Sequence, residues 1–565
     1  MRSRLTASLP VALLVALFAG TPLSPVPARA AKPSTAAPAP SALTAEQWRQ
    51  DLAFLVRTMK EVHPRLGWRV GLDTLETAVG DLDRRIPTLS DDEIVVGLMR
   101  IAAMPRDGHT YVMPWGGALA TGTVFPVRLY RFSDGLFVTA APKTQAELAG
   151  AKVERIGGVP VDDAFDRVSD LLGYDNSYTR LERAPAALVT PIVAHGAGLT
   201  SSRESIELTV VTRKGARKTI RVVAVPEPNH GAWLRDGSLA PEGFATSAPE
   251  SASRPRSWPR AANYWFELLP GTKTVYVQFR EVQHMREEPF GAFCERLFRF
   301  VDDQDVDRLV LDIRNNTGGN NGILKPLYHG IIKRDRINQR GHFITIIGRG
   351  TFSAAMNCAA FLEEQTNVLF TGEPSGASPC EAGDAKRFTL PRSGLPFQVS
   401  QYLWLNTVPW DNRPWIRPHV PATRSSKDYF TGRDPALETA LSMSNYKPIA
   451  ERMQEAWGRG GASAARGELV AYHKEYPDLP GASAESDVNR FGYELLARDR
   501  VDDAIQVFRW NTEDYPNSWN AWDSFGEALV KKGEREKAIA AYRRSLELNP
   551  QSGSGREALR QLTGS

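Results

Sequence analysis

The chain has 565 residues, a formal net charge of +4 and 24% charged residues. This length exceeds what one hydrophobic core can organise, so two to four domains are expected. The weak charge, with no basic stripe that carries interleaved aromatic residues, argues against a nucleic-acid-binding protein. The composition is that of an ordinary globular protein.

The first 30 residues predict an export signal. Arg2 and Arg4 precede an apolar run from Leu9 to Phe18, and Ala28-Arg29-Ala30 fits the small-x-small cleavage rule. The arginines are not adjacent, which favours unfolded export over a twin-arginine route. No later run reaches the roughly 20 apolar residues of a membrane-spanning helix. We therefore expect cleavage near Ala30 and an extracytoplasmic protein, either periplasmic or secreted.

An N-terminal helical region is predicted over residues 44–120, after an Ala/Pro/Ser-rich linker at 31–43. Thr44-Ala45-Glu46-Gln47 is a capping box that opens the first helix. Apolar residues then recur at helical spacing along two further segments. The three expected helices are Thr44–His63, Leu72–Ile86 and Ser90–Ala103.

A small β-rich module is predicted over residues 121–228, because short alternating segments are separated by glycine turns. It should contain one or two helices, the first from Asp163 to Leu172. A Pro/Gly/Ser-rich loop follows at 229–262. The expected strands are Val127–Tyr130, Leu136–Thr139 and Ala151–Ile156.

Strand and helix patterns alternate over residues 263–445, which predicts an α/β domain. Its expected elements include strands at Thr274–Phe279, Leu309–Ile313 and Phe343–Ile347, and helices at Pro289–Val301 and Ala354–Glu364.

The C-terminal residues 485–565 repeat with a period of 34 residues, as Pro516 and Pro550 illustrate. This period and its marked positions are typical of helix-turn-helix tetratricopeptide (TPR) repeats. Residues 446–484 form a helical linker or a degenerate first repeat, and a terminal helix from Arg556 to Leu562 could cap the array. The recurring residues are Phe491-Gly492, Ala504, Phe508 and Pro516, matched by Phe525-Gly526, Ala538, Tyr542 and Pro550.

Two segments of the α/β domain carry the chemistry. Asp312-Ile313-Arg314-Asn315-Asn316-Thr317-Gly318-Gly319 runs from a buried strand into a glycine turn, which can aim backbone N–H groups at an anion. Ser353 lies between a strand and a helix, where free N–H groups and the helix dipole favour negative charge. The pattern indicates an oxyanion hole facing a nucleophile. A helix-capping serine is the structural alternative, and Asp312 with Arg314 should brace the loop as an ion pair.

With Thr371-Gly372-Glu373-Pro374-Ser375-Gly376 downstream, these segments resemble the S41 peptidases, which include the C-terminal processing proteases and the tricorn core. The resemblance covers Tyr264 to about Leu441 and implies a ClpP/crotonase-like α/β core. More weakly, Phe125 to Val225 is similar to the PDZ-type module of that family.

The base that activates the serine divides this family. One branch uses a lysine just after the Gly-Glu turn, but here Ala377 and Ser378 follow Gly376. The tricorn-like branch takes a histidine from the N-terminal region, and Asp107-Gly108-His109-Thr110 resembles its motif. Since a serine hydroxyl needs a base within hydrogen-bond reach, the resemblance implies His109. The structural alternative for His109 is a surface turn residue.

The resemblance also supplies the acid and the oxyanion hole. The tricorn-like acid position matches Asp411, although the segment departs from the family pattern, with an aspartate in place of the usual glutamate, Trp415 in place of glycine and His419 in place of aspartate. A turn-forming Asp-Asn pair is the alternative for Asp411. Backbone N–H groups of Gly318 or Gly319, together with Ala354, would form the oxyanion hole.

The sequence is also compatible with two other functions. Ser353, Asp411 and His419 follow the chain order of α/β-hydrolases, but the Gly-x-Ser-x-Gly elbow is missing. Alternatively, the chain is a non-catalytic scaffold that binds peptides or ligands and recruits a partner through its repeats.

We expect an exported serine peptidase that acts on peptides or proteins, with the repeats as a possible protein-binding surface. No cofactor or metal is predicted, because hydrolysis by a serine needs none and no nucleotide motif is present. Three cysteines argue against a zinc cluster or a disulfide scaffold, and pairing of Cys358 with Cys380 stays open.

Overall fold

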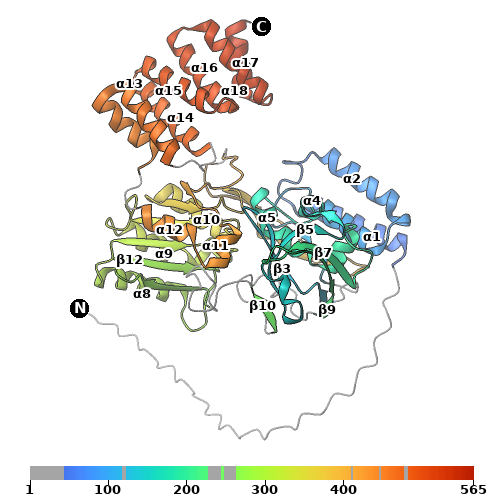
Figure 1. Ribbon diagram of the computed structural model, residues 1–565. Coiled ribbons are helices and arrows are strands. Elements are labelled where there is room, and N and C mark those ends of the chain that lie inside the picture. Colours follow the sequence, from blue (N-terminus) through green and yellow to red (C-terminus); the bar gives the residue numbers. More distant parts are fainter. Residues whose placement is uncertain are drawn as a thin grey trace, which may run out of the picture. The chain divides into compact units, whose positions relative to one another are not determined.

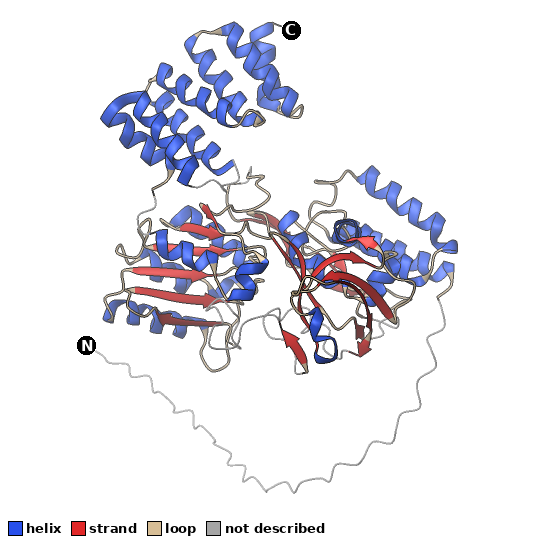
Figure 2. Cartoon of the chain, in the orientation of Figure 1, coloured by secondary structure: helices blue, strands red, loops and turns tan. Residues whose placement is uncertain are grey.

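A computed structural model describes residues 43–116, 122–226, 243–246, 262–408, 411–443, 447–475 and 482–564. The predicted export signal, the linker and most of the loop predicted at 229–262 lie outside these residues. The described chain is mixed α/β, with helices first and last in sequence and sheets between them (Figures 1 and 2).

The three helices expected near the N-terminus are confirmed. Two of them begin at capping boxes, in which the side chains of Thr44 and Ser90 accept the N–H three residues later. Each helix buries an apolar face in a shared cluster with the sheet that follows in the sequence. The helices are α1 (Ala45–Val62), α2 (Leu72–Arg85) and α3 (Asp91–Ala103).

The β-rich module forms a seven-stranded sheet in the order β10-β4-β5-β7-β8, with β3 paired to β4 and β6 to β5. Three helices accompany it, where one or two were expected. The second contains Pro185, which argues against a helix interior, and the third has only 6 residues, too few to show a helical period. The strands are β3 (Arg128–Phe132), β4 (Gly135–Pro142), β5 (Lys152–Ile156), β6 (Val159–Pro160), β7 (Ser205–Val211), β8 (Arg217–Val223) and β10 (Phe244–Thr246), and the helices are α4 (Val161–Ser169), α5 (Ser177–Leu188) and α6 (Pro191–Gly196).

The α/β domain is built on a six-stranded sheet, β11-β12-β13-β14-β15-β20, parallel from β12 onward. Side chains alternate between its two faces: Leu309 and Leu311 pack with α8, α9 and α10, whereas Val310 packs with α12. Figure 1 shows α8 and α9 beside these strands. The elements are β11 (Tyr264–Leu268), β12 (Thr274–Phe279), β13 (Arg308–Asp312), β14 (Phe343–Ile347), β15 (Leu369–Gly372), β20 (Val420–Pro421), α8 (Phe290–Asp303), α9 (Lys325–Ile332), α10 (Ala354–Gln365) and α12 (Pro435–Ser442).

Four short strands leave this domain between β15 and β20. β16 (Cys380–Gly383) pairs with β19 (Tyr402–Leu405), while β17 (Lys386–Thr389) and β18 (Pro396–Val399) form a hairpin. The hairpin joins β1 (Tyr111–Val112), which follows the N-terminal helices. Its side chains Phe397 and Val399 belong to the apolar cluster of α1 and α3, so this hairpin packs with the N-terminal half of the chain.

The C-terminal region is entirely helical among its described residues. Recurring residues fill equivalent positions: an added Cβ would lie 2.5 Å from the Phe508 ring at Gly492 and 3.1 Å from the Tyr542 ring at Gly526. The 34-residue period thus reflects one helix pressing an aromatic ring onto a glycine of the helix before it. The helices are α13 (Ile449–Glu475), α14 (Ala482–Ala497), α15 (Val501–Asp514), α16 (Trp519–Lys532), α17 (Arg535–Leu548) and α18 (Gly553–Thr563).

In the part of the chain that the structure describes, no helix combines the length and the apolar character needed to span a bilayer.

The expected ion pair between Asp312 and Arg314 is confirmed, with an N–O distance of 2.9 Å. The Arg314 guanidinium also contacts Asp434 at 2.7 Å, and Asp434 caps α12 by accepting the N–H of Leu437. Tyr276 donates its hydroxyl to Asp312 at 2.6 Å. This buried network fixes the start of the glycine turn to α12.

Replacing Asp434 with alanine should destabilise the protein by about 3–5 kcal/mol, because a buried guanidinium loses a partner and α12 loses its cap. The matched control is Asp83→Ala, whose partner Arg49 and whose own side chain are 38% and 46% exposed; its cost should stay below about 1 kcal/mol. Urea unfolding checks both, and equal costs would contradict the role given to the network.

Candidate active site

Ser353 occupies a strained backbone position between β14 and α10. Its φ of 53° and ψ of −127° lie in a region that L-residues rarely adopt, at a cost on the order of 1–3 kcal/mol. The residue is placed as the N-cap of α10, yet its side chain makes no capping hydrogen bond. The capping explanation therefore does not account for the hydroxyl, which points elsewhere.

The hydroxyl of Ser353 meets the imidazole of His109. The Ser353 Oγ lies 3.0 Å from the His109 Nε2, across 244 positions of sequence. The ring of Phe352 stacks on the imidazole with centroids 4.5 Å apart. This arrangement places a base within hydrogen-bond reach of an alcohol, which is the first requirement for a nucleophilic serine.

The loop that carries His109 is attached to the hairpin β17–β18. Tyr111 pairs with Gln398 in the β1–β18 ladder, and the side chain of Gln398 donates to the carbonyl of His109 at 2.9 Å. The hydroxyl of Ser400 donates to Asp107 at 2.8 Å. These contacts hold the histidine by its backbone and leave the ring free to face Ser353.

The buried side chain of Asp107 stabilises the loop that carries His109. It accepts the backbone N–H of His109 at 2.7 Å and contacts the His63 ring at 2.7 Å. Burial opposes its ionised form, but the hydrogen bond and charge of His63 prevail and lower the pKa of Asp107 to about 2. Asp107 is therefore a charged structural anchor beneath the histidine.

The His109 ring is largely removed from solvent, and several nearby groups act on its charge. Burial is the largest influence on it and lowers the pKa of His109 to about 4, with Arg183 acting in the same direction and Asp107 against it. The ring is therefore neutral at neutral pH, the state that accepts a proton. Its Nδ1 is buried without a hydrogen bond of normal geometry, although the nearby backbone of Ala382 favours the protonated ring weakly.

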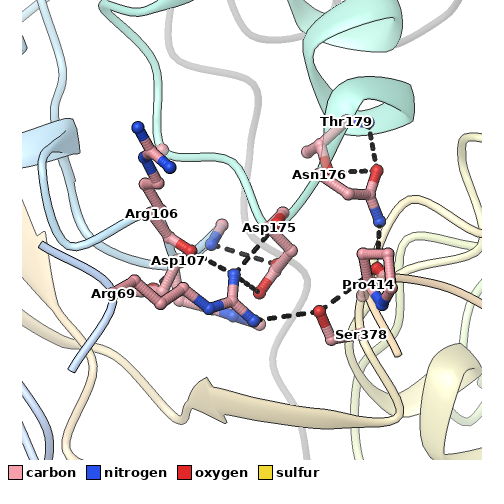
Figure 3. A network of polar contacts seen from close by, with 12 residues as sticks. Arg69, Arg106, Asp107, Asp175, Asn176, Thr179, Ser378 and Pro414 are labelled. Atoms are coloured by element: carbon pink, nitrogen blue, oxygen red, sulfur yellow. Dashed lines mark hydrogen bonds and ion pairs between the residues drawn. The ribbon is translucent and has the colours of Figure 1, made fainter. Parts of the chain in front are cut away.

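A polar network ties this loop to the α/β domain (Figure 3). The Arg69 guanidinium donates to the carbonyls of Arg106 and Asp175, at 2.6 and 2.9 Å, and to the Ser378 hydroxyl at 3.0 Å. Ser378 in turn donates to the carbonyl of Pro414. Arg69 lies in the turn between α1 and α2, outside every motif in the sequence, and its part in the site was therefore not predicted.

The glycine turn supplies backbone donors next to Ser353. A Cβ on Gly318 would lie 2.7 Å from the Cβ of Ser353, so the turn approaches the serine as closely as only glycine allows. The N–H of Gly318 already donates to the Asn316 side chain at 2.9 Å. Within the described residues, no hydrogen bond is found for the N–H of Gly319 or of Ala354. Of the three candidate donors, the N–H groups of Gly319 and Ala354 are therefore the two that are open to a further acceptor.

The structure does not bring Asp411 to His109. Asp411 accepts the Thr407 hydroxyl at 2.8 Å and pairs with the Arg413 guanidinium at 2.8 Å, which also contacts Glu363. Its oxygens are taken up by these neighbours. The sequence around this acid departs from the family pattern at Trp415 and His419, and Asp411 pairs with neighbours in its own loop instead.

His419 is a structural residue. Its Nδ1 accepts the backbone N–H of Phe370 on β15 at 2.9 Å, and burial lowers its pKa to about 4. This removes the ring from the role that the α/β-hydrolase chain order would give it. The three cysteines are buried and unpaired, and no group of residues suited to holding a metal occurs among those described.

Comparison with solved structures finds a related fold. No family model matches the chain, and a search of curated proteins found no match. Mature CPAF complexed with lactacystin is similar over 71% of this chain and 98% of its own, at 12% identity and a TM-score of 0.51. A second structure of mature CPAF is also 12% identical, over 70% and 96% of the two chains, with a TM-score of 0.51.

A photosystem II D1 C-terminal processing protease is also similar, at 14% identity over 71% of this chain and 98% of its own, with a TM-score of 0.34. At these identities the CPAF structures establish a shared fold, and the D1 protease adds no weight at its TM-score. The mixed α/β architecture is thus one that this chain shares with CPAF.

Gly108→Ala should destabilise the site. The new Cβ would lie 2.4 Å from the Phe352 ring and 2.7 Å from an Asp175 oxygen. Such overpacking costs about 1–3 kcal/mol. Gly291→Ala in α8 is the control, because an added Cβ there meets nothing within 4 Å and should be neutral or slightly stabilising. Urea unfolding of both variants checks this, and an unaffected Gly108→Ala protein would contradict the packing.

Proposed function

We propose that this chain is an exported serine peptidase of the tricorn-like S41 type. The single observation that carries the proposal is the 3.0 Å contact between Ser353 Oγ and His109 Nε2. The strained backbone at Ser353 and the two free N–H groups beside it fit the same chemistry. A shared fold with CPAF is consistent with it but is shown at low identity.

The reaction begins with proton transfer. Neutral His109 accepts the Ser353 proton as Oγ attacks the carbonyl carbon of a peptide bond. The N–H groups of Gly319 and Ala354 face the oxygen on which negative charge develops. Protonated His109 then gives its proton to the leaving amine, and a water molecule, deprotonated by the same ring, releases the acyl group. No step is assigned to Asp411, since Arg413 and Thr407 engage its oxygens.

The remaining domains are assigned supporting roles. The β-rich module of residues 121–228 is proposed as a PDZ-like domain that receives extended substrates as an added strand. The helices of residues 485–565 are proposed as TPR repeats that bind a protein partner. The N-terminal signal would direct the chain out of the cytoplasm, so its substrates would be extracytoplasmic peptides or proteins.

Ser353→Ala and His109→Ala should each lower peptide hydrolysis by about 10³-fold or more, because nucleophile and base act as one unit. His329→Ala is the matched control, since this ring lies exposed on α9. A quenched fluorescent peptide library measures the rates, and a serine-directed phosphonofluoridate reports the hydroxyl directly. An unlabelled Ser353 in the intact protein would favour the non-catalytic scaffold instead.

Peptide hydrolysis should persist in mild acid. The acidic limb of kcat/KM reports the base of the free enzyme, and burial lowers the pKa of His109 to about 4. At pH 5.5 such a base is almost fully neutral, whereas an ordinary histidine would be only roughly 10% neutral. A pH–rate profile between pH 3.5 and about 8 distinguishes these cases. A midpoint near 6.5 would contradict a buried, neutral base.

A further inference from the structure

One side chain from α5 contacts the residue that precedes each member of the proposed dyad. The Nη1 of Arg183 donates to the carbonyl of Gly108 at 2.7 Å, one residue before His109. The guanidinium of the same residue lies over the ring of Phe352, one residue before Ser353, at 4.7 Å from its centroid. Arg183 thus connects the loop of the base to the turn of the nucleophile.

The contacts converge on the imidazole. The Phe352 ring contacts both the guanidinium and the ring of His109, on which it stacks at 4.5 Å. The N–H of Gly108 donates to the Asp175 carboxylate at 3.1 Å, just before α5. Gly108, the residue before His109, is therefore held through its N–H by Asp175 and through its carbonyl by Arg183.

The N-terminal end of α5 is fixed to the α/β domain. The Asn176 amide donates to the carbonyls of Ser375 and Pro414, at 3.1 and 2.7 Å (Figure 3). Thr179 donates to the carbonyl of Gly376, whose N–H donates to the carbonyl of Thr351 at 3.1 Å. Since Thr351 lies two residues before Ser353, these contacts fix the position of α5, and with it Arg183, relative to Ser353.

We infer that Arg183 is a positioning residue that holds the His109 ring against Ser353 through Gly108 and Phe352. The inference deepens the proposed peptidase function and rests on it. Arg183 contacts neither the Ser353 hydroxyl nor the reacting nitrogen, so its effect passes through its two neighbours. Its loss should therefore slow the chemical step rather than weaken substrate binding.

The charge of Arg183 gives this role a measurable signature. The groups that act on His109 are Asp107 in its own loop, Arg183 on α5, Asp384 after β16 and the backbone of Ala382. Arg183 opposes protonation of the ring, whereas both acids and the backbone favour it. Removing the positive charge should therefore raise the pKa of His109, and a positively charged replacement should keep it low.

The first measurement is the kinetics of Arg183→Gln with the fluorescent peptides. We expect kcat to fall on the order of 10²-fold with KM changed less than about threefold, as for a base displaced by about an ångström. Arg180→Gln is the matched control: it lies one turn earlier on α5, and its guanidinium contacts Ser169 and Asp170 instead. Its kcat should stay at the wild-type value.

The second measurement does not need hydrolysis. In a Ser353→Ala background with ¹³C-labelled histidine, NMR titration gives the pKa of His109 directly. Arg183→Gln should raise this pKa, and Arg183→Lys should return it toward the parent value because the charge is kept. If the intact protein hydrolyses no peptide, the peptidase proposal fails, while this titration still decides the role of Arg183.

The inference is overturned if Arg183→Gln keeps the wild-type kcat and the parent pKa of His109. It is also overturned if Gln and Lys variants lose kcat equally with no change in that pKa, because the role is then structural only. Should Arg183→Gln fail to fold, Arg183→Met serves in both measurements, since its chain can still pack on Phe352.

Discussion

A hydrogen bond of 3.0 Å joins His109 to Ser353, and everything that the site can do depends on two distant parts of the chain meeting to make it. The two residues lie in different parts of the fold, His109 before β1 and Ser353 before α10. His109 is held by its backbone, through the β1–β18 ladder and the side chain of Gln398. Ser353 is held by the turn after β14, against the glycines that end the loop of β13.

Burial gives this contact its chemical meaning. An imidazole removed from water stays neutral and is therefore available to accept the proton of the Ser353 hydroxyl, and local dipoles act more strongly there than in water. The strain at Ser353 is offset by the packed layers around it, including the Asp312–Arg314–Asp434 network at the foot of the same loop. A strained site of this kind needs well-packed surroundings. They are provided by two apolar clusters, one in the N-terminal half of the chain and one in the α/β domain.

Sequence reasoning singled out Ser353 and His109 because both lie in short local motifs, and the structure places the two side chains 3.0 Å apart. Helices with capping boxes, such as the one at Thr44, were predicted closely for the same reason. What it could not supply was long-range pairing: Arg183 and Asp175 have no motif, and Pro185 conceals the helix that carries Arg183. The acid was assigned to Asp411 by position in a pattern, whereas its partners depend on Arg413 and Thr407, which a pattern does not weigh.

The hairpin β17–β18 is made late in the chain but belongs to the apolar cluster of the first helices. A nascent chain that stops before residue 399 would carry Ser353 and His109 yet lack the strand that anchors the histidine loop. Assembly of the Ser353–His109 pair is therefore postponed until most of the polypeptide has been synthesised.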